Sequence, residues 1–169
     1  MRWRSALALA ATLILAPLAA KADDAWRTFH SAERGFSVEA PGDPQHSQTQ
    51  SKDGAAVDVW IIESNSQGVI IVMVSTIAPG VTKGGALLDQ TVAGMAKDPG
   101  KTLVSSTPVK VKGADARDIV VKVADGGMLA RDRLVFSKGV LFQVIIMTKQ
   151  ADPPMKDAER VLRSFRLIK

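Results

Sequence analysis

Short segments in which apolar side chains alternate with polar ones, or run uninterrupted, predict a chain built mostly of β-strands. Three of these segments follow one another at residues 116–123, 128–136 and 140–147. The links between them, 125–127 and 137–139, contain glycine, which adopts the positive φ of tight hairpin loops without strain. The pattern therefore predicts a three-stranded antiparallel meander.

Two of the predicted strands are apolar on both faces. The segment 140–147 carries seven apolar side chains in eight positions, and the segment 69–77 is similarly apolar. Because side chains alternate between the two faces of a strand, a strand with almost no polar positions must be covered on both sides. We expect both strands to lie centrally in a sheet, with 69–77 forming a hairpin with 57–62.

The outer strands are predicted from polar and proline-containing segments. Residues 26–29 and 35–40 favour an opening hairpin, which two following prolines end because proline cannot donate a ladder hydrogen bond. The polar segment 45–53 favours an exposed edge strand or a loop. The segment 103–111 contains Pro108, which favours an edge strand or a bulge.

Two further segments have helical periodicity. Leu88, Val92 and Met95 recur at i, i+4 and i+7, which predicts an amphipathic helix over about residues 82–97. A second helix is predicted near the C-terminus, where Asp152 is a candidate N-cap. One stripe of that helix carries the apolar side chains Met155, Ala158, Leu162 and Phe165.

The order of these elements predicts the fold class. Hairpin-length links demand antiparallel pairing, and doubly apolar strands demand cover on both faces. We therefore expect an α+β fold, an α/β/α sandwich with a central antiparallel β-sheet flanked by helices. No internal repeat or low-complexity linker marks a second domain, so residues 23–169 are expected to form a single domain.

Residues 1–22 have the pattern of a cleaved signal peptide. Two arginines precede an apolar run at 6–18, and the small residues Ala20 and Ala22 fit a cleavage site. The run is about the length of a signal-peptide core and too short for a stable spanning helix, although a retained anchor is the alternative. We expect cleavage after Ala22, a periplasmic or secreted protein, and no stable membrane anchor after cleavage.

Composition narrows the classes of function. Three of the 22 basic residues lie in 1–22, which leaves 19 against 17 acidic residues and gives little support for a nucleic-acid or membrane-surface partner. The chain has no tyrosine, and no aromatic side chains are interleaved with the basic ones as a stacking platform, so nucleic acid is not an expected partner. The absence of cysteine excludes disulfides, thiol chemistry and cysteine metal sites.

Four features occur in a recognisable order along the chain. They are WRTF at 26–29 with GFSVEAPG at 35–42, the mid-chain helix, GADAR at 113–117, and a closing SFRL at 164–167. Together they resemble the PsbP-like family, which includes extrinsic subunits of photosystem II and a nuclear-import factor that binds the GTPase Ran. The resemblance implies an α/β/α sandwich about an antiparallel sheet. None of the motifs is catalytic, so it implies a fold and not an activity.

The two histidines supply the one candidate catalytic site. His30 and Glu33 lie in one predicted turn, and His46 follows Asp43 in the next polar segment, so a divalent metal bound by these residues is conceivable in a metal-assisted hydrolase. A catalytic zinc needs three rigidly held protein ligands, which polar loops do not ensure. We expect no enzymatic activity and no cofactor, with this hydrolase as the alternative.

Basic side chains on the meander supply the candidate binding site. Arg131 and Arg133 point to one side of their strand, and Arg117 lies in the neighbouring strand. If the loop at 125–126 has two residues, Asp118 lies directly opposite Arg133 and forms a cross-strand ion pair.

These observations predict an exported, non-enzymatic binding or accessory module of the cell envelope. Its partner is expected to be an envelope protein or a small apolar ligand. The candidate contact residues are Arg117, Arg131, Arg133, Asp43 and His46.

Overall fold

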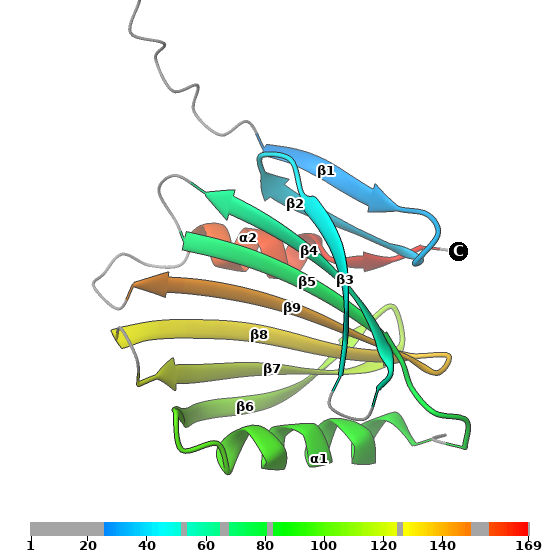
Figure 1. Ribbon diagram of the computed structural model, residues 1–169, viewed down its shortest axis with the longest axis vertical. Helices are drawn as coiled ribbons and strands as arrows, with labels where there is room; N and C mark the ends of the chain where they lie inside the picture. The colour runs from blue at the N-terminus through cyan, green and yellow to red at the C-terminus, as the bar shows by residue number, and fades with distance from the viewer. Residues whose placement is uncertain are drawn as a thin grey trace, which may run out of the picture.

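The computed structural model describes residues 26–51, 54–64, 68–80, 83–124, 127–149 and 156–168. Within them, a seven-stranded antiparallel sheet runs in the order β3-β4-β5-β9-β8-β7-β6 (Figure 1). The bounds are β3 Gln45–Gln50, β4 Ala56–Ser64, β5 Gly68–Thr76, β6 Lys101–Val111, β7 Ala114–Val123, β8 Met128–Ser137 and β9 Val140–Lys149. The predicted meander is confirmed, and β5 and β9 lie centrally as expected. The predicted signal peptide lies outside the described residues.

A second, three-stranded sheet packs with the large one. It consists of β1 Trp26–Ser31, β2 Phe36–Pro41 and β10 Arg166–Leu167, in the order β1-β2-β10. The opening hairpin is therefore confirmed, but the expectation of one sheet was wrong, because β2 pairs with the short strand at the end of the chain.

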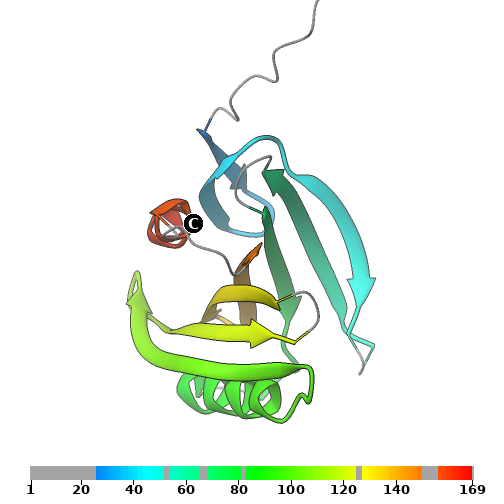
Figure 2. The same ribbon diagram turned by 90° about the vertical axis from the view of Figure 1, so that its left-hand side faces the viewer.

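One helix lies on each side of the large sheet. Helix α1, Gly84–Ala96, contacts β6, β7 and β8 on one face, whereas α2, Lys156–Ser164, lies with the small sheet over the other (Figure 2). The α+β class is confirmed. A sandwich is not confirmed, since each helix covers only part of a face. The predicted N-cap Asp152 and Met155 lie outside the described residues.

Aromatic rings join the small sheet and α2 to the large sheet. Phe36 of β2 is fully buried, and its ring contacts Trp60 of β4 edge-on at a centroid distance of 5.1 Å. The Phe36 ring also stacks on Phe165, just after α2, at 6.0 Å, and Phe142 of β9 lies 6.2 Å away. Burial of these large apolar rings is the main stabilisation of this face.

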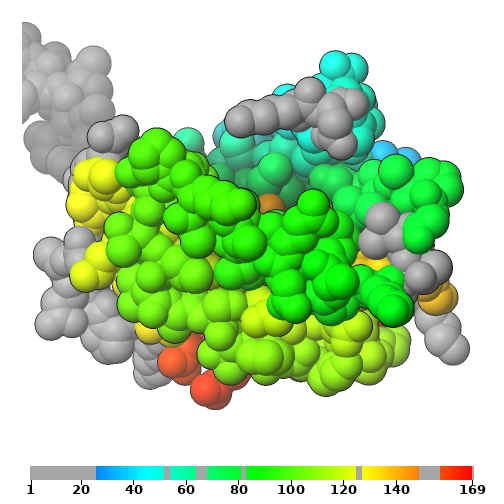
Figure 3. Space-filling view, turned by 90° about the horizontal axis from the view of Figure 1, so that it is seen from below, coloured from blue at the N-terminus to red at the C-terminus, as the bar shows by residue number. Residues whose placement is uncertain are grey.

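The opposite face is covered less completely. Figure 3 looks onto α1, whose Leu88 is buried, and Gly84 at its start allows a close approach to the Phe136 ring. A Cβ at Gly84 would lie 2.8 Å from that ring, so the helix docks there because the position is glycine. Beyond α1, Ile71 and Ile145 are only half-buried. The prediction that both central strands are covered on both faces was therefore wrong for this face.

No helix among these residues is both long enough and apolar enough to span a bilayer.

Candidate functional site

Two hairpin turns at one end of the large sheet each consist of a lysine followed by a glycine. The β6–β7 turn has φ of 47° at Lys112 and 82° at Gly113, and the β8–β9 turn has φ of 51° at Lys138 and 77° at Gly139. Two successive positive φ angles are typical of a type I′ turn, which favours Asn-Gly. In the described part of the chain only these lysines combine a positive φ with a side chain, at a cost of about 1–2 kcal/mol each.

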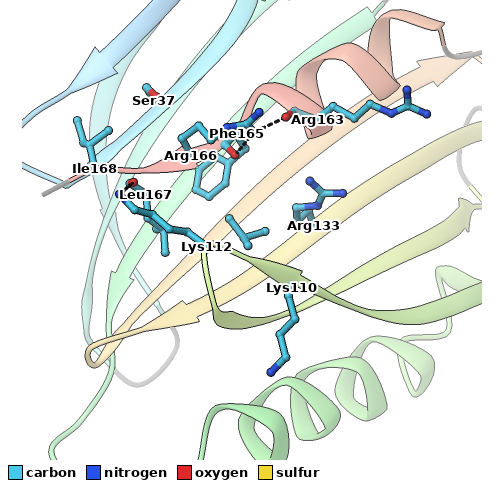
Figure 4. A pocket seen from close by; sticks show the side chains of 10 residues that line it. Ser37, Lys110, Lys112, Arg133, Arg163, Phe165, Arg166, Leu167 and Ile168 are labelled. Carbon is cyan, nitrogen blue, oxygen red and sulfur yellow. Dashed lines mark hydrogen bonds between the residues drawn. The ribbon is translucent and has the colours of Figure 1, made fainter.

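A cavity of about 720 Å³ opens beside the Lys112 turn (Figure 4). Ten of the described residues line it, half of them basic and none of them acidic; they are Ser37, Lys110, Val111, Lys112, Arg133, Arg163, Phe165, Arg166, Leu167 and Ile168. Figure 4 shows Lys110 directed toward α1, whereas Lys112, Arg133 and Arg166 lie around the Phe165 ring. The cavity therefore combines positive charge with an apolar wall.

A second cavity, of about 300 Å³, adjoins the first. In the described part of the chain its lining also has no acidic residue; it consists of Arg34, Gly35, Lys112, Ser137, Lys138, Val140, Phe142, Leu167 and Ile168. Lys112, Leu167 and Ile168 line both cavities. Seven cations of the described residues line the two cavities, and we call five of them the basic end: Arg34, Lys112, Arg133, Lys138 and Arg166. The other two are Lys110, which is directed toward α1, and Arg163, which pairs with Glu159.

Arg133 is the member of the basic end that the sequence predicted. Its Nε donates to Asp118 Oδ1 at 2.6 Å and its Nη2 to Asp118 Oδ2 at 2.7 Å, so the predicted cross-strand pair is confirmed. Arg133 Nη1 also donates to the Leu162 carbonyl near the end of α2. A cation is stabilised there because the last carbonyls of a helix carry partial negative charge.

Two of the remaining cations of the large cavity bond to backbone carbonyls. Lys112 Nζ donates to the Leu167 carbonyl at 3.0 Å, and Arg166 Nη1 donates to the carbonyls of Phe165, at 2.9 Å, and Arg163. Among the described residues, neither these two nor Lys138 forms an ion pair with a carboxylate. Their charges are therefore available to an anion.

The other predicted basic residues lie elsewhere. Arg131 shares the face of Arg133, with Nη1 3.9 Å from Glu159 Oε1 of α2. Arg117 lies on the opposite face, because its register partner is Leu134, and it pairs with Asp89 of α1. The structure therefore does not bring Arg117 to the face that carries the other two candidate arginines.

His46 belongs to a second cluster, which surrounds a buried carboxylate and shares Arg34 with the basic end. Asp58 accepts from Gln48 Nε2 at 2.9 Å and from Arg34 Nη2 at 2.6 Å, and His46 Nε2 lies 3.0 Å from it. Burial raises the pKa of Asp58, but the hydrogen bonds from Gln48 and His46 and the charge of Arg34 outweigh it and hold the pKa below its ordinary value. The His46 ring stacks on Trp60 at 4.6 Å.

The structure does not assemble the candidate metal site. His46 has Asp58 as its partner, and Asp43 accepts from Arg27 Nη1 at 2.9 Å. Within the described ranges, no three histidine or carboxylate side chains are grouped as metal ligands.

Sequence reasoning missed the two turn lysines and Arg166. The sequence feature that could have identified the two lysines is a Lys-Gly pair repeated at two hairpin turns. The meander brings both turns to the same end of the sheet. Arg166 could not be placed, because its position depends on the pairing of β10 with β2.

Several solved structures have a similar fold, among them CyanoP and PA94. CyanoP, the cyanobacterial PsbP of Synechocystis sp. PCC 6803, matches with a TM-score of 0.55 and 12% identity, covering 90% of this chain and 98% of CyanoP. PA94 of Pseudomonas aeruginosa, a protein of unknown function, matches with a TM-score of 0.52 and 16% identity, covering 82% of this chain and 94% of PA94. No family model and no curated protein sequence matches. The chain has a PsbP-like fold.

Proposed function

We propose that this protein is an exported, non-enzymatic binding or accessory module of the cell envelope that holds an anionic ligand at the basic end. The observation that carries the proposal is the pair of adjoining cavities, which share Lys112 and whose described lining residues include cations but no carboxylate. Export rests on the signal-peptide pattern of residues 1–22.

Charge and shape define the class of ligand. Lys112 and Arg166 offer donors that have no carboxylate partner among the described residues. Charge-assisted hydrogen bonds to a carboxylate or phosphate are stronger than neutral ones. Phe165 and Leu167 provide apolar wall beside them. The proposed ligand is therefore an anion with an apolar body. Small-molecule sites in proteins commonly combine an apolar lining with a few polar groups in this way.

The strained, left-handed backbone at Lys112 and Lys138 supports a functional role for these two lysines. Strained backbone persists where the surroundings enforce it and clusters at ligand sites. Lys112 lines both cavities and Lys138 lines the smaller one, so both left-handed lysines are at the proposed site.

Titration of the isotopically labelled protein with octanoate, octyl phosphate and neutral octanol, followed by NMR, tests the proposal. We expect the two anions to shift amide signals of the Lys112 and Lys138 turns, with octanol at least tenfold weaker. The double variant Lys112→Asn/Arg166→Gln should weaken anion binding at least tenfold, because it removes two positive charges from the cavity. Asparagine tolerates the left-handed backbone, so the turn is kept. Lys122→Gln is the control, because Lys122 is exposed on β7 and lines neither cavity. Equal binding by all three proteins, or no binding at millimolar ligand, would refute the proposal.

A further inference from the structure

The large sheet has two edges that differ in how they are protected. Strand β6 carries Lys101, Lys110 and Pro108, and its pairing with β7 is interrupted by a bulge between Leu103 and Ser105. Charges, proline and bulges are the devices by which edge strands avoid pairing with other chains. Helix α1 also contacts β6. This edge is therefore blocked against a further strand.

Strand β3 at the other edge has none of these devices. Its sequence, QHSQTQ, contains no lysine, no proline and no acidic residue, and all six residues are exposed. Its pairing with β4 runs from Gln45 to Gln50 without a register shift. Figure 2 shows β3 in cyan at the outer rim of the sheet. An edge strand of this kind presents unpaired backbone N–H and C=O groups to solvent.

Side-chain contacts hold β3 in place for pairing. Gln48 Nε2 donates to Asp58 on β4, His46 contacts the same carboxylate, and the His46 ring stacks on Trp60. These contacts come from alternate residues, so they fix one face of β3 and leave the backbone edge free. Because the strand is already ordered, an added strand loses little conformational entropy on the β3 side.

We propose that β3 pairs antiparallel with β3 of a second copy of this chain, joining the two large sheets across a twofold axis. An axis perpendicular to the sheet reverses the strand direction and keeps each face on the same side, as a closed dimer requires. With the axis at Ser47, His46 faces Gln48 and Gln45 faces Thr49. With the axis at Gln48, Ser47 faces Thr49. In both registers no lysine, arginine or carboxylate is among the opposed residues, and their polar side chains can form cross-strand hydrogen bonds.

Charge favours dimerisation through the β3 edge over dimerisation through the β6 edge. Two β6 edges would bring Lys101 and Lys110 of both copies into one interface, whereas two β3 edges bring no charged side chain together. A six-residue strand spans only about 20 Å. The expected dimer is therefore of the weak, concentration-dependent class.

Sedimentation equilibrium from about 10 µM to 1 mM tests the dimer. We expect a monomer–dimer transition within this range, and Ser47→Lys/Thr49→Lys should raise its midpoint at least tenfold, because either register places lysines opposite each other. Thr107→Lys on β6 is the matched control and should leave the midpoint unchanged. A monomer throughout, or a dimer that tolerates the β3 lysines, would overturn the proposal.

Cross-linking tests the register directly, because the natural chain has no cysteine. Directly opposed residues in antiparallel strands have Cα atoms about 4.5–5.5 Å apart, which suits a disulfide. On mild oxidation, Ser47→Cys/Thr49→Cys should form a disulfide-linked dimer much faster than Ser105→Cys/Thr107→Cys on β6. Equal rates would contradict pairing through β3. Lys112→Asn should not affect the dimer, so this test is independent of the proposed anion site.

Discussion

The Asp118 carboxylate and the Arg133 guanidinium meet in a two-bond ion pair, with donor–acceptor distances of 2.6 and 2.7 Å, across strands β7 and β8. Arg133 also donates to the Leu162 carbonyl, so one side chain links two strands to α2. Its side chain is 14% exposed and that of Asp118 is 32% exposed. The pair is therefore partly shielded from water, and its loss leaves two acceptors without their donor.

Arg133→Ala should lower the free energy of unfolding by about 2 kcal/mol, because a shielded carboxylate and a helix-end carbonyl both lose their donor. Urea denaturation measures the change. Arg163→Ala is the control, since Arg163 pairs with Glu159 on the exposed surface of α2 and such pairs contribute about 0.5 kcal/mol or less. Similar losses of unfolding free energy in both variants would show that shielding the Arg133 pair from water adds nothing to stability.

Asp132 is a buried carboxylate on the α1 face of β8, only 4% exposed, with Oδ1 lacking a hydrogen-bond partner in the described structure. Burial raises its pKa to about 7; the hydrogen bond from Gln143 and the charge of Lys101 oppose the rise, and the charge of Asp118 adds to it. The native state thus holds a proton that the unfolded chain releases near pH 4.

Stability should therefore be highest near pH 4, fall as pH rises toward 7, and level off above it, with a total loss on the order of 3 kcal/mol from this group. Asp132→Asn should remove this fall, so the variant should melt at a higher temperature than the natural protein at pH 8 and at a similar one at pH 4. Thermal melts from pH 4 to 8 measure both curves. Parallel curves for the two proteins would contradict the assignment to Asp132.

Asp58 should produce the opposite pH dependence. Because its pKa is lowered in the folded state, its stabilisation is complete above pH 4 and is lost as pH falls below that value. Asp58→Asn should be less stable than the natural protein at pH 7, and the difference should shrink by pH 3. Denaturation at the two pH values measures it, and a difference that stays constant would show that the charge of Asp58 contributes nothing.

Replacing either turn lysine should raise the stability of the protein and weaken its binding of an anion. Lys112→Asn and Lys138→Asn should each stabilise the protein by about 0.5–1 kcal/mol, because asparagine adopts the left-handed backbone more readily. The Lys112 variant loses its hydrogen bond to Leu167, so its gain should be the smaller one. Both should weaken binding of octanoate. A stabilised variant with undiminished binding would remove that lysine from the site.

Strand predictions succeeded where local pattern and register decide the outcome. The turn at 125–126 lies outside the described residues, yet the pairing of Asp118 with Arg133 is the one that a two-residue loop there demands. Pro108 and the polar residues of β3 correctly indicated edge strands. Arg117 could not be placed from the sequence, because charge alone does not tell which face a side chain takes, whereas its pairing with Leu134 does.

The sequence by itself determined most of the strands, the two helices and the antiparallel pairing within each hairpin, since period-2 and period-3.6 patterns and hairpin-length links act over a few neighbouring residues. Only the tertiary structure decided the pairing of β10 with β2, the half-covered face beside α1 and the gathering of Lys112, Lys138 and Arg166 around two cavities. These features depend on contacts between distant segments, and the free energy of such contacts is set by shared burial and charge, which no local pattern encodes.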